Sequence, residues 1–89
     1  MLIALIAKDK PGALQTRLDN RTAHLGYIEE TGIVAQAGPL LEGDAMIGSL
    51  IILNVEDLTA AQKWADNDPY AKAGLFQTVE LIPWKKVIG

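Results

Sequence analysis

The sequence has no cysteine and only one histidine among its 89 residues. Without cysteine there is no disulfide framework and no zinc site built on sulfur. One histidine alone also argues against a histidine-based metal site. A chain of this length forms one domain and buries only roughly 60–65% of the surface that its unfolded form exposes. Because such small domains depend on a metal, on association or on unusually good packing, association is the leading candidate.

Positive charge is also scarce, with 8 Lys and Arg against 11 Asp and Glu and a net charge of −3. Nucleic-acid surfaces need clustered positive charge, so we expect no nucleic-acid partner. The apolar run 2–7 is too short to span a bilayer and lacks the basic residues that begin a signal peptide, which predicts a cytoplasmic location and no membrane association. Nucleotide-binding and zinc motifs are missing, so we expect no cofactor.

The apolar and turn-forming residues alternate in an order typical of a strand, helix, strand, strand, helix, strand (βαββαβ) chain. A helical apolar pattern opens after Pro11, which suits a first helical turn, and stops before Gly32. Asp57 is a good N-cap for the second helix, and Asp68-Pro69 ends it. The predicted elements are strand 2–7, helix 11–31, strand 33–37, a turn at Gly43-Asp44, strand 46–55, helix 57–67 and strand 75–82. This order predicts an α+β fold with two helices on one face of a four-stranded antiparallel sheet.

Two of the predicted strands are apolar at both odd and even positions, which decides the expected assembly. In strands 2–7 and 50–53 both faces carry Leu, Ile or Ala. An antiparallel sheet with one face in water should alternate, and two helices can cover only one face. We therefore expect a homodimer whose sheets pack together. A different protein covering the same face is the alternative.

The only histidine, His24, lies on the first predicted helix, one turn after Arg21 and two turns after Arg17. These three polar residues form a stripe beside the apolar face made by Leu14, Leu18 and Leu25. A partly exposed helix histidine is one interpretation. The other is a general acid or base whose two neighbouring arginines attract an anion.

Asp68 stands at a helix C-terminus, where a negative charge is mildly unfavourable. Capping a new short helix that begins at Pro69 would explain it. The functional alternative is an acid that orients the histidine through its second ring nitrogen. Both roles are compatible, because a carboxylate has two oxygens.

Three further positions are candidates for a binding site. Ser49 follows Gly48 in an apolar strand, but no Gly-x-Ser-x-Gly motif surrounds it, so it is not expected to be a nucleophile. The Gly38-Pro39 pair would end a strand, or let a ligand approach the backbone closely. Trp64 and Trp84 are interpreted as core or interface residues.

Several motifs together resemble the YciI-related family over the whole chain. They are Arg21-Thr22-Ala23-His24-Leu25, Ala37-Gly38-Pro39, Gly48-Ser49, Asp68-Pro69-Tyr70 with Ala73-Gly74, and the closing Val79, Pro83 and Lys85-Lys86-Val87. The resemblance implies one domain over residues 1–89, with a ferredoxin-like subunit that forms a dimeric α/β barrel. It also implies a small-molecule site in which His24 and Asp68 form a catalytic pair.

The same resemblance implies the rest of the site. Arg21, Ser49, Gly38, Pro39 and Tyr70 would bind the substrate around the pair. Relatives include proteins that break down chlorinated aromatic compounds, and similar barrels host isomerases and lyases. We therefore expect a cofactor-free enzyme that transfers a proton on a small cyclic or anionic metabolite, for example in a dehydrochlorination. A non-catalytic module for small-ligand binding or dimerisation is the alternative.

Overall fold

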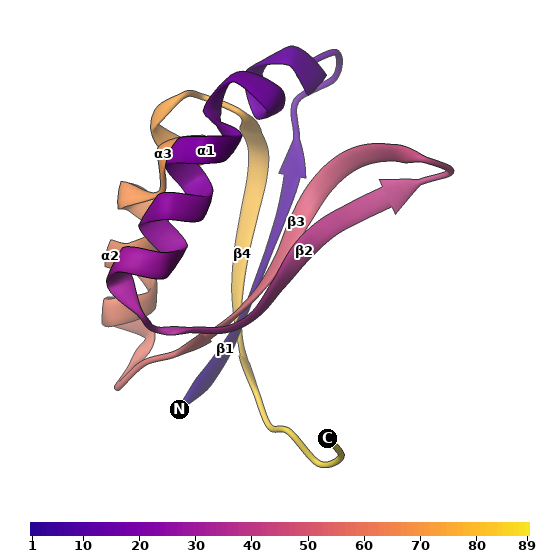
Figure 1. Cartoon of the computed structure of the whole chain (residues 1–89). Helices are drawn as coiled ribbons and strands as arrows, with labels where there is room; N and C mark the ends of the chain where they lie inside the picture. Colours follow the sequence, from indigo (N-terminus) through magenta and orange to yellow (C-terminus); the bar gives the residue numbers. More distant parts are fainter.

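The computed structural model describes residues 1–89 as one sheet with a single layer of helices (Figure 1). Four antiparallel strands lie in the order β2-β3-β1-β4, as expected for a ferredoxin-like fold. The elements are β1 (Leu2–Asp9), α1 (Leu14–Thr31), β2 (Val34–Glu42), β3 (Ala45–Asn54), α2 (Leu58–Asn67), α3 (Pro69–Lys72) and β4 (Phe76–Trp84). The predicted α+β fold class is confirmed. None of the helices combines the length and apolar character needed to cross a bilayer.

Some predicted boundaries were wrong for local reasons. Pro11 does not begin α1, because Gly12 adopts φ 70° in a turn and the helix starts only at Leu14. Residues 38–39 do not end β2, which continues through them to Glu42. A proline has no backbone N–H to donate, and β2 is an edge strand, where this donor is not needed. The same reason lets β4, the other edge strand, run through Pro83.

All three helices lie on one side of the sheet, and the core fills the space between the two layers (Figure 1). The buried side chains on this face of the central strands pack against one side of α2, and the cluster contains Ile3, Leu5, Ala7, Ile51, Leu53, Ala61, Trp64 and Ala65. The Trp64 indole N–H donates to Thr31 Oγ1 at 2.9 Å, which ties α2 to the end of α1. Trp64 is therefore a core residue, as expected.

The face of α1 that meets the sheet is polar from Arg17 to His24, and Tyr27 and Ile28 near the end of the helix pack against the core. Arg17 and His24 are its buried residues, whereas Leu14, Leu18 and Leu25 are each nearly half exposed. Helices of soluble proteins normally turn their apolar face to the core. In this protein the stripe that carries the arginines and the histidine faces the sheet instead, so α1 covers a polar site.

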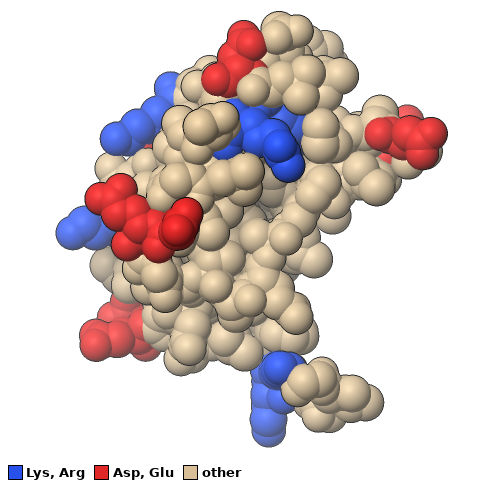
Figure 2. All heavy atoms as spheres, viewed as in Figure 1, with Lys and Arg blue, Asp and Glu red and all other residues tan.

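The opposite face of the sheet has no covering element (Figure 1). Cross-strand neighbours on this face include Ala4, Ile52 and Ile82, and the next row contains Ile6 and Leu50. Leu50 and Ile82 are about two-fifths exposed. After β4 the chain leaves the sheet as a short arm that contains two lysines (Figures 1 and 2).

Candidate functional site

His24 and Asp68, 44 residues apart in the sequence, meet between α1 and the start of α3. The His24 Nδ1 atom lies 2.7 Å from Asp68 Oδ1. The histidine is 6% exposed and the aspartate 0%. The expected pair of residues is therefore in direct contact, and water is excluded from it.

Local sequence places Asp68 at this point. The residue before a proline is pushed out of the helical region, and Asp68 is extended with φ −61° and ψ 128°. It thus ends α2 and caps α3, where its Oδ1 accepts a hydrogen bond from the backbone N–H of Tyr70 at 3.0 Å. The predicted cap is confirmed. The two roles are not divided between two oxygens, however, because Oδ1 receives both hydrogen bonds and the buried Oδ2 has no partner.

The hydrogen bond fixes the chemistry of the imidazole ring. An ionised carboxylate only accepts hydrogen bonds, so the ring proton resides on Nδ1. In the neutral ring this leaves Nε2 with a free lone pair. That nitrogen has no partner in the protein and is not enclosed by it. The pair can therefore present a base at Nε2, or an acid once the ring is protonated.

Tyr70 forms one wall beside the histidine. Its ring stacks on the imidazole with centroids 3.9 Å apart and an interplanar angle of 13°. The guanidinium carbon of Arg17 lies 4.8 Å from the Tyr70 ring centroid. Burial raises the pKa of Tyr70 above its ordinary value, although the positive charges of Arg17 and Arg21 oppose this effect. Tyr70 is thus a neutral aromatic surface that holds the imidazole flat.

Arg17 is not a free anion-binding group, which corrects the expectation of two arginines available beside the histidine. Its Nε donates to Asp9 Oδ2 at 2.7 Å and its Nη2 to Asp9 Oδ1 at 2.9 Å. The same Nη2 donates to Ser49 Oγ at 2.9 Å. Burial alone would lower the pKa of Arg17, but the hydrogen bonds and charge of Asp9 outweigh it and raise the pKa. Arg21 makes no ion pair, so its charge remains available.

These groups converge on one cavity, which we call the His24 cavity. It has a volume of about 190 Å³ and lies between α1 and the β2–β3 part of the sheet. A dry apolar cavity of about 150 Å³ can hold a benzene molecule, so this one has room for a single substituted six-membered ring. The residues that line it are Arg17, Arg21, His24, Leu25, Ile28, Ala37, Gly38, Pro39, Met46, Ser49, Ile51 and Tyr70. Of the residues proposed from the sequence, only Asp68 lies outside this lining, behind the histidine.

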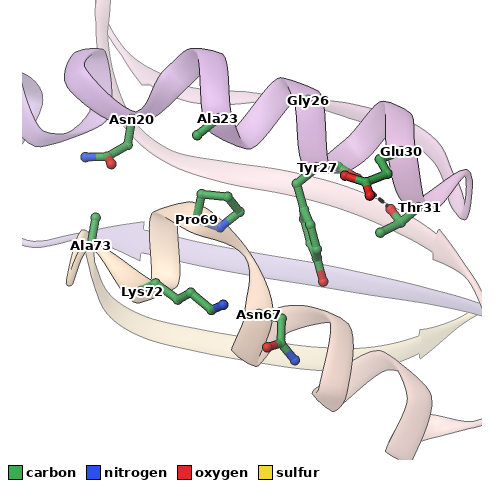
Figure 3. Close-up of a pocket in the computed structure, with 10 residues that line it drawn as sticks. All are labelled: Asn20, Ala23, Gly26, Tyr27, Glu30, Thr31, Asn67, Pro69, Lys72 and Ala73. Carbon is green, nitrogen blue, oxygen red and sulfur yellow. Dashed lines mark hydrogen bonds between the residues drawn. The ribbon is translucent and has the colours of Figure 1, made fainter.

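A larger hollow lies between α1 and the α2–α3 segment (Figure 3). Its volume is about 990 Å³, and it is an open groove at the surface. The side chains in Figure 3 include Asn20 and Tyr27 from α1 opposite Pro69 and Lys72 from α3. No buried acid or base lines it, whereas the smaller cavity has His24. For this reason we regard the His24 cavity as the candidate site, despite its smaller volume.

Sequence reasoning missed Asp9 as a member of the site. Asp9 is the last residue of β1, at a point where the pairing with β4 shifts in register. Nothing in the local sequence links Asp9 to Arg17. The polar spacing of Arg17, Arg21 and His24 was the available signal, because a buried arginine needs an acidic partner. No group of three or more His, Cys, Asp or Glu side chains is placed to hold a metal ion.

Comparison with known proteins supports this assignment of the fold. The model of the YCII-related domain matches residues 1–85. The chain belongs to the YCII-related family. Protein YciI of Escherichia coli O6:H1 (strain CFT073) is 39% identical, with 98% of this chain and 99% of the relative covered. A Haemophilus influenzae relative, an uncharacterized protein, is 32% identical over the same shares of the two chains.

Two solved structures of known proteins are similar to this YCII-related chain. One is the 5-chloro-2-hydroxyhydroquinone dehydrochlorinase (TftG) of Burkholderia phenoliruptrix AC1100, in complex with 2,5-dihydroxybenzoquinone. It is 37% identical with a TM-score of 0.89, and the match covers 96% of this chain and 94% of that chain. An antibiotic biosynthesis monooxygenase has a TM-score of 0.58 at 13% identity, covering 97% and 100% of the two chains. The second likeness shows the fold alone.

The pH at which the two tyrosines lose their phenolic protons tests the packing around the site. Burial is the largest cause that raises the pKa of both Tyr27 and Tyr70, and the charge of Asp68 adds to it. The folded state thus binds the phenolic protons more tightly than the unfolded state does. The stabilisation is complete below pH ~10, the unfolded value, and is lost as the pH rises through the folded values. We expect the ultraviolet signal of tyrosinate to appear at higher pH in the native protein than in urea, and coincident curves would contradict the packing.

Proposed function

We propose that this protein is a small cofactor-free enzyme that transfers protons on a single-ring substrate, with His24 and Asp68 as its catalytic pair. The observation that carries the proposal is the 2.7 Å hydrogen bond between His24 Nδ1 and Asp68 Oδ1. It orients the ring so that Nε2 is left as a base beside the cavity. Histidine positioned in this way accelerates proton transfer by about 10²–10⁴-fold.

The energetics of Asp68 also favour a catalytic role. Its Oδ2 is buried without a hydrogen-bond partner, an arrangement that costs roughly 1–3 kcal/mol or more for a charged group. A cap alone requires no such burial, because Asp57 caps α2 from an exposed position. We attribute the buried carboxylate to its action on the imidazole, which it holds in one tautomer and stabilises when the ring becomes charged.

The substrate class follows from the size and charge of the cavity, together with the relative of known activity. A volume of about 190 Å³ suits one ring. Arg21 supplies a positive charge that no carboxylate neutralises, so a ring with an acidic hydroxyl or an enolate oxygen is favoured. Gly38, Pro39 and Ser49 line the wall formed by the sheet and Tyr70 lies beside His24. We propose that these four residues and Arg21 bind the substrate.

Dehydrochlorination of a chlorinated hydroxyhydroquinone is one reaction that this arrangement can perform. The imidazole would take a hydroxyl proton and return it to the ring carbon that carries chlorine. Chloride would then leave with its bonding electron pair, and a second hydroxyl proton would be lost, so that HCl is released overall. Each proton step needs only Nε2 of His24, and the developing oxygen charge would be stabilised by Arg21.

We expect His24→Ala to lower chloride release from 5-chloro-2-hydroxyhydroquinone by about 10²–10⁴-fold, because the proton carrier is lost. Asn20→Ala, on the same helix but in the groove of Figure 3, is the matched control and should retain full activity. Equal turnover by His24→Ala and the native protein would refute the proposal. If the native protein binds 2,5-dihydroxybenzoquinone without any turnover and His24→Ala weakens that binding, the site is a binding module.

We further propose that two copies associate through their uncovered sheet faces and that the protein acts in the cytoplasm. The apolar side chains of that face support the first proposal, because contiguous exposed apolar surface marks an association site. Leu50 on β3 and Ile82 on β4 are 40% and 44% exposed there. A two-fold dimer would cover both copies with the same set of residues.

Introducing charge on this face should separate the copies. We expect Leu50→Lys combined with Ile82→Lys to halve the mass measured by light scattering, since lysine ammonium groups cannot be buried unpaired. Leu58→Lys is the matched control, because Leu58 is 44% exposed on the helical side and should leave the dimer intact. A native protein that is monomeric at micromolar concentration would rule out this interface.

A further inference from the structure

The Arg17 side chain sets the direction of a hydrogen bond inside the candidate site. Guanidinium groups have donors and no acceptor. In the contact between Arg17 Nη2 and Ser49 Oγ, at 2.9 Å, the serine oxygen must therefore accept. Both residues are buried, at 3% exposure each, so water does not compete for this bond. The polarity of the contact is thus fixed by chemistry alone.

Asp9 holds the guanidinium in place for this purpose. It binds Nε and Nη2 at 2.7 and 2.9 Å, so the planar fork cannot rotate without breaking a two-point ion pair. The pairing also cancels the charge of Arg17. As a result, Arg17 contributes a directed donor to the cavity wall, whereas Arg21 contributes net positive charge.

The hydroxyl proton of Ser49 then has to point away from Arg17. Ser49 makes no other hydrogen bond within the protein, and it lines the His24 cavity. We infer that Arg17 is a positioning residue which makes Ser49 an obligate donor into the cavity, so that the site selects a ring with an acceptor oxygen, a carbonyl or enolate, at Ser49. This inference rests on the proposed function and specifies the substrate class for the same site.

The arrangement divides the tasks of a proton-transfer reaction between two sides of the substrate. Nε2 of neutral His24 accepts a proton, whereas Ser49 donates a hydrogen bond. Negative charge that develops on the substrate oxygen as the proton leaves would be stabilised by this fixed donor. Removing one donor to such an oxyanion typically costs about 10²–10³-fold in kcat. Ser49 thus acts as a donor to the oxyanion and not as a nucleophile.

The test combines two ligands that share one carbon–oxygen skeleton with a double-mutant cycle. The ligands are 2,5-dihydroxybenzoquinone, which has carbonyl oxygens that only accept hydrogen bonds, and its reduced form 1,2,4,5-tetrahydroxybenzene, kept anaerobic, in which hydroxyls that also donate replace these carbonyls. The variants are Ser49→Ala, which removes the donor, and Arg17→Lys, which keeps the charge opposite Asp9 but lacks the planar fork. Ser49→Thr retains a hydroxyl and serves as the conservative variant.

We expect Ser49→Ala to weaken binding of the quinone by about 10–100-fold, in line with a hydrogen bond to a charged group. Its effect on the reduced ligand should be much smaller, and Ser49→Thr should restore most of the preference for the quinone. In the native background, Arg17→Lys should reduce the preference for the quinone by a similar factor. In the Ser49→Ala background, Arg17→Lys should change this preference by less than about threefold, because the two residues act together. In turnover, both single variants should lower kcat more than they raise KM.

Three outcomes would count against the inference. Unchanged quinone affinity in Ser49→Ala, or an equal loss from Arg17→Lys in both backgrounds, would overturn it while leaving the proposed function standing. Absence of both binding and turnover in the native protein would overturn the proposed function itself, and this inference with it. If Arg17→Lys fails to fold, as judged by thermal unfolding, the comparison of Ser49→Ala with Ser49→Thr decides the matter alone.

Discussion

The hydrogen bond from His24 to Asp68 joins the middle of α1 to the junction of α2 and α3, and the remaining features of the site are arranged around it. Asp68 reaches the histidine only because Pro69 ends α2 and starts α3 at that residue. The histidine faces inward only because α1 presents its polar stripe to the sheet. Tyr70 stacks on the imidazole because it is the second residue of the helix that Asp68 caps. One short segment, Asp68-Pro69-Tyr70, thus supplies the carboxylate, the helix start and the aromatic wall.

This arrangement has an energetic cost in so small a protein. Four polar or charged residues are buried, namely Arg17, His24, Ser49 and Asp68. By contrast, three leucines of α1 are nearly half exposed. Replacing buried ionic groups by apolar ones of similar volume is often neutral or stabilising. The polar site is therefore better explained by function than by stability. A second copy on the open face of the sheet would bury further apolar side chains. This burial would compensate for the small apolar contribution of α1.

The order of elements was predicted from local signals in the sequence, whereas the pairing of His24 with Asp68 was expected only from the resemblance to the YciI-related family. Gly32, Asp57 and Asp68-Pro69 are helix boundaries readable from backbone preferences alone. The extent of β2 and the partner of Arg17 could not be predicted in this way. Residues 38–39 are compatible with a strand only once β2 is known to be an edge, and Asp9 meets Arg17 only after β1 and α1 have packed. Such features depend on tertiary contacts that no short-range pattern encodes.

The central claim is that Asp68 fixes the histidine tautomer so that Nε2 is the free base beside the cavity. With only one histidine in the chain, nitrogen-15 NMR of the ring reports on this site without overlap. At a pH where the ring is neutral, the account predicts a proton on Nδ1 and an unprotonated Nε2 in the native protein. In Asp68→Asn the amide can donate to Nδ1, and the proton should move to Nε2. A native ring protonated at Nε2 when neutral would contradict the account.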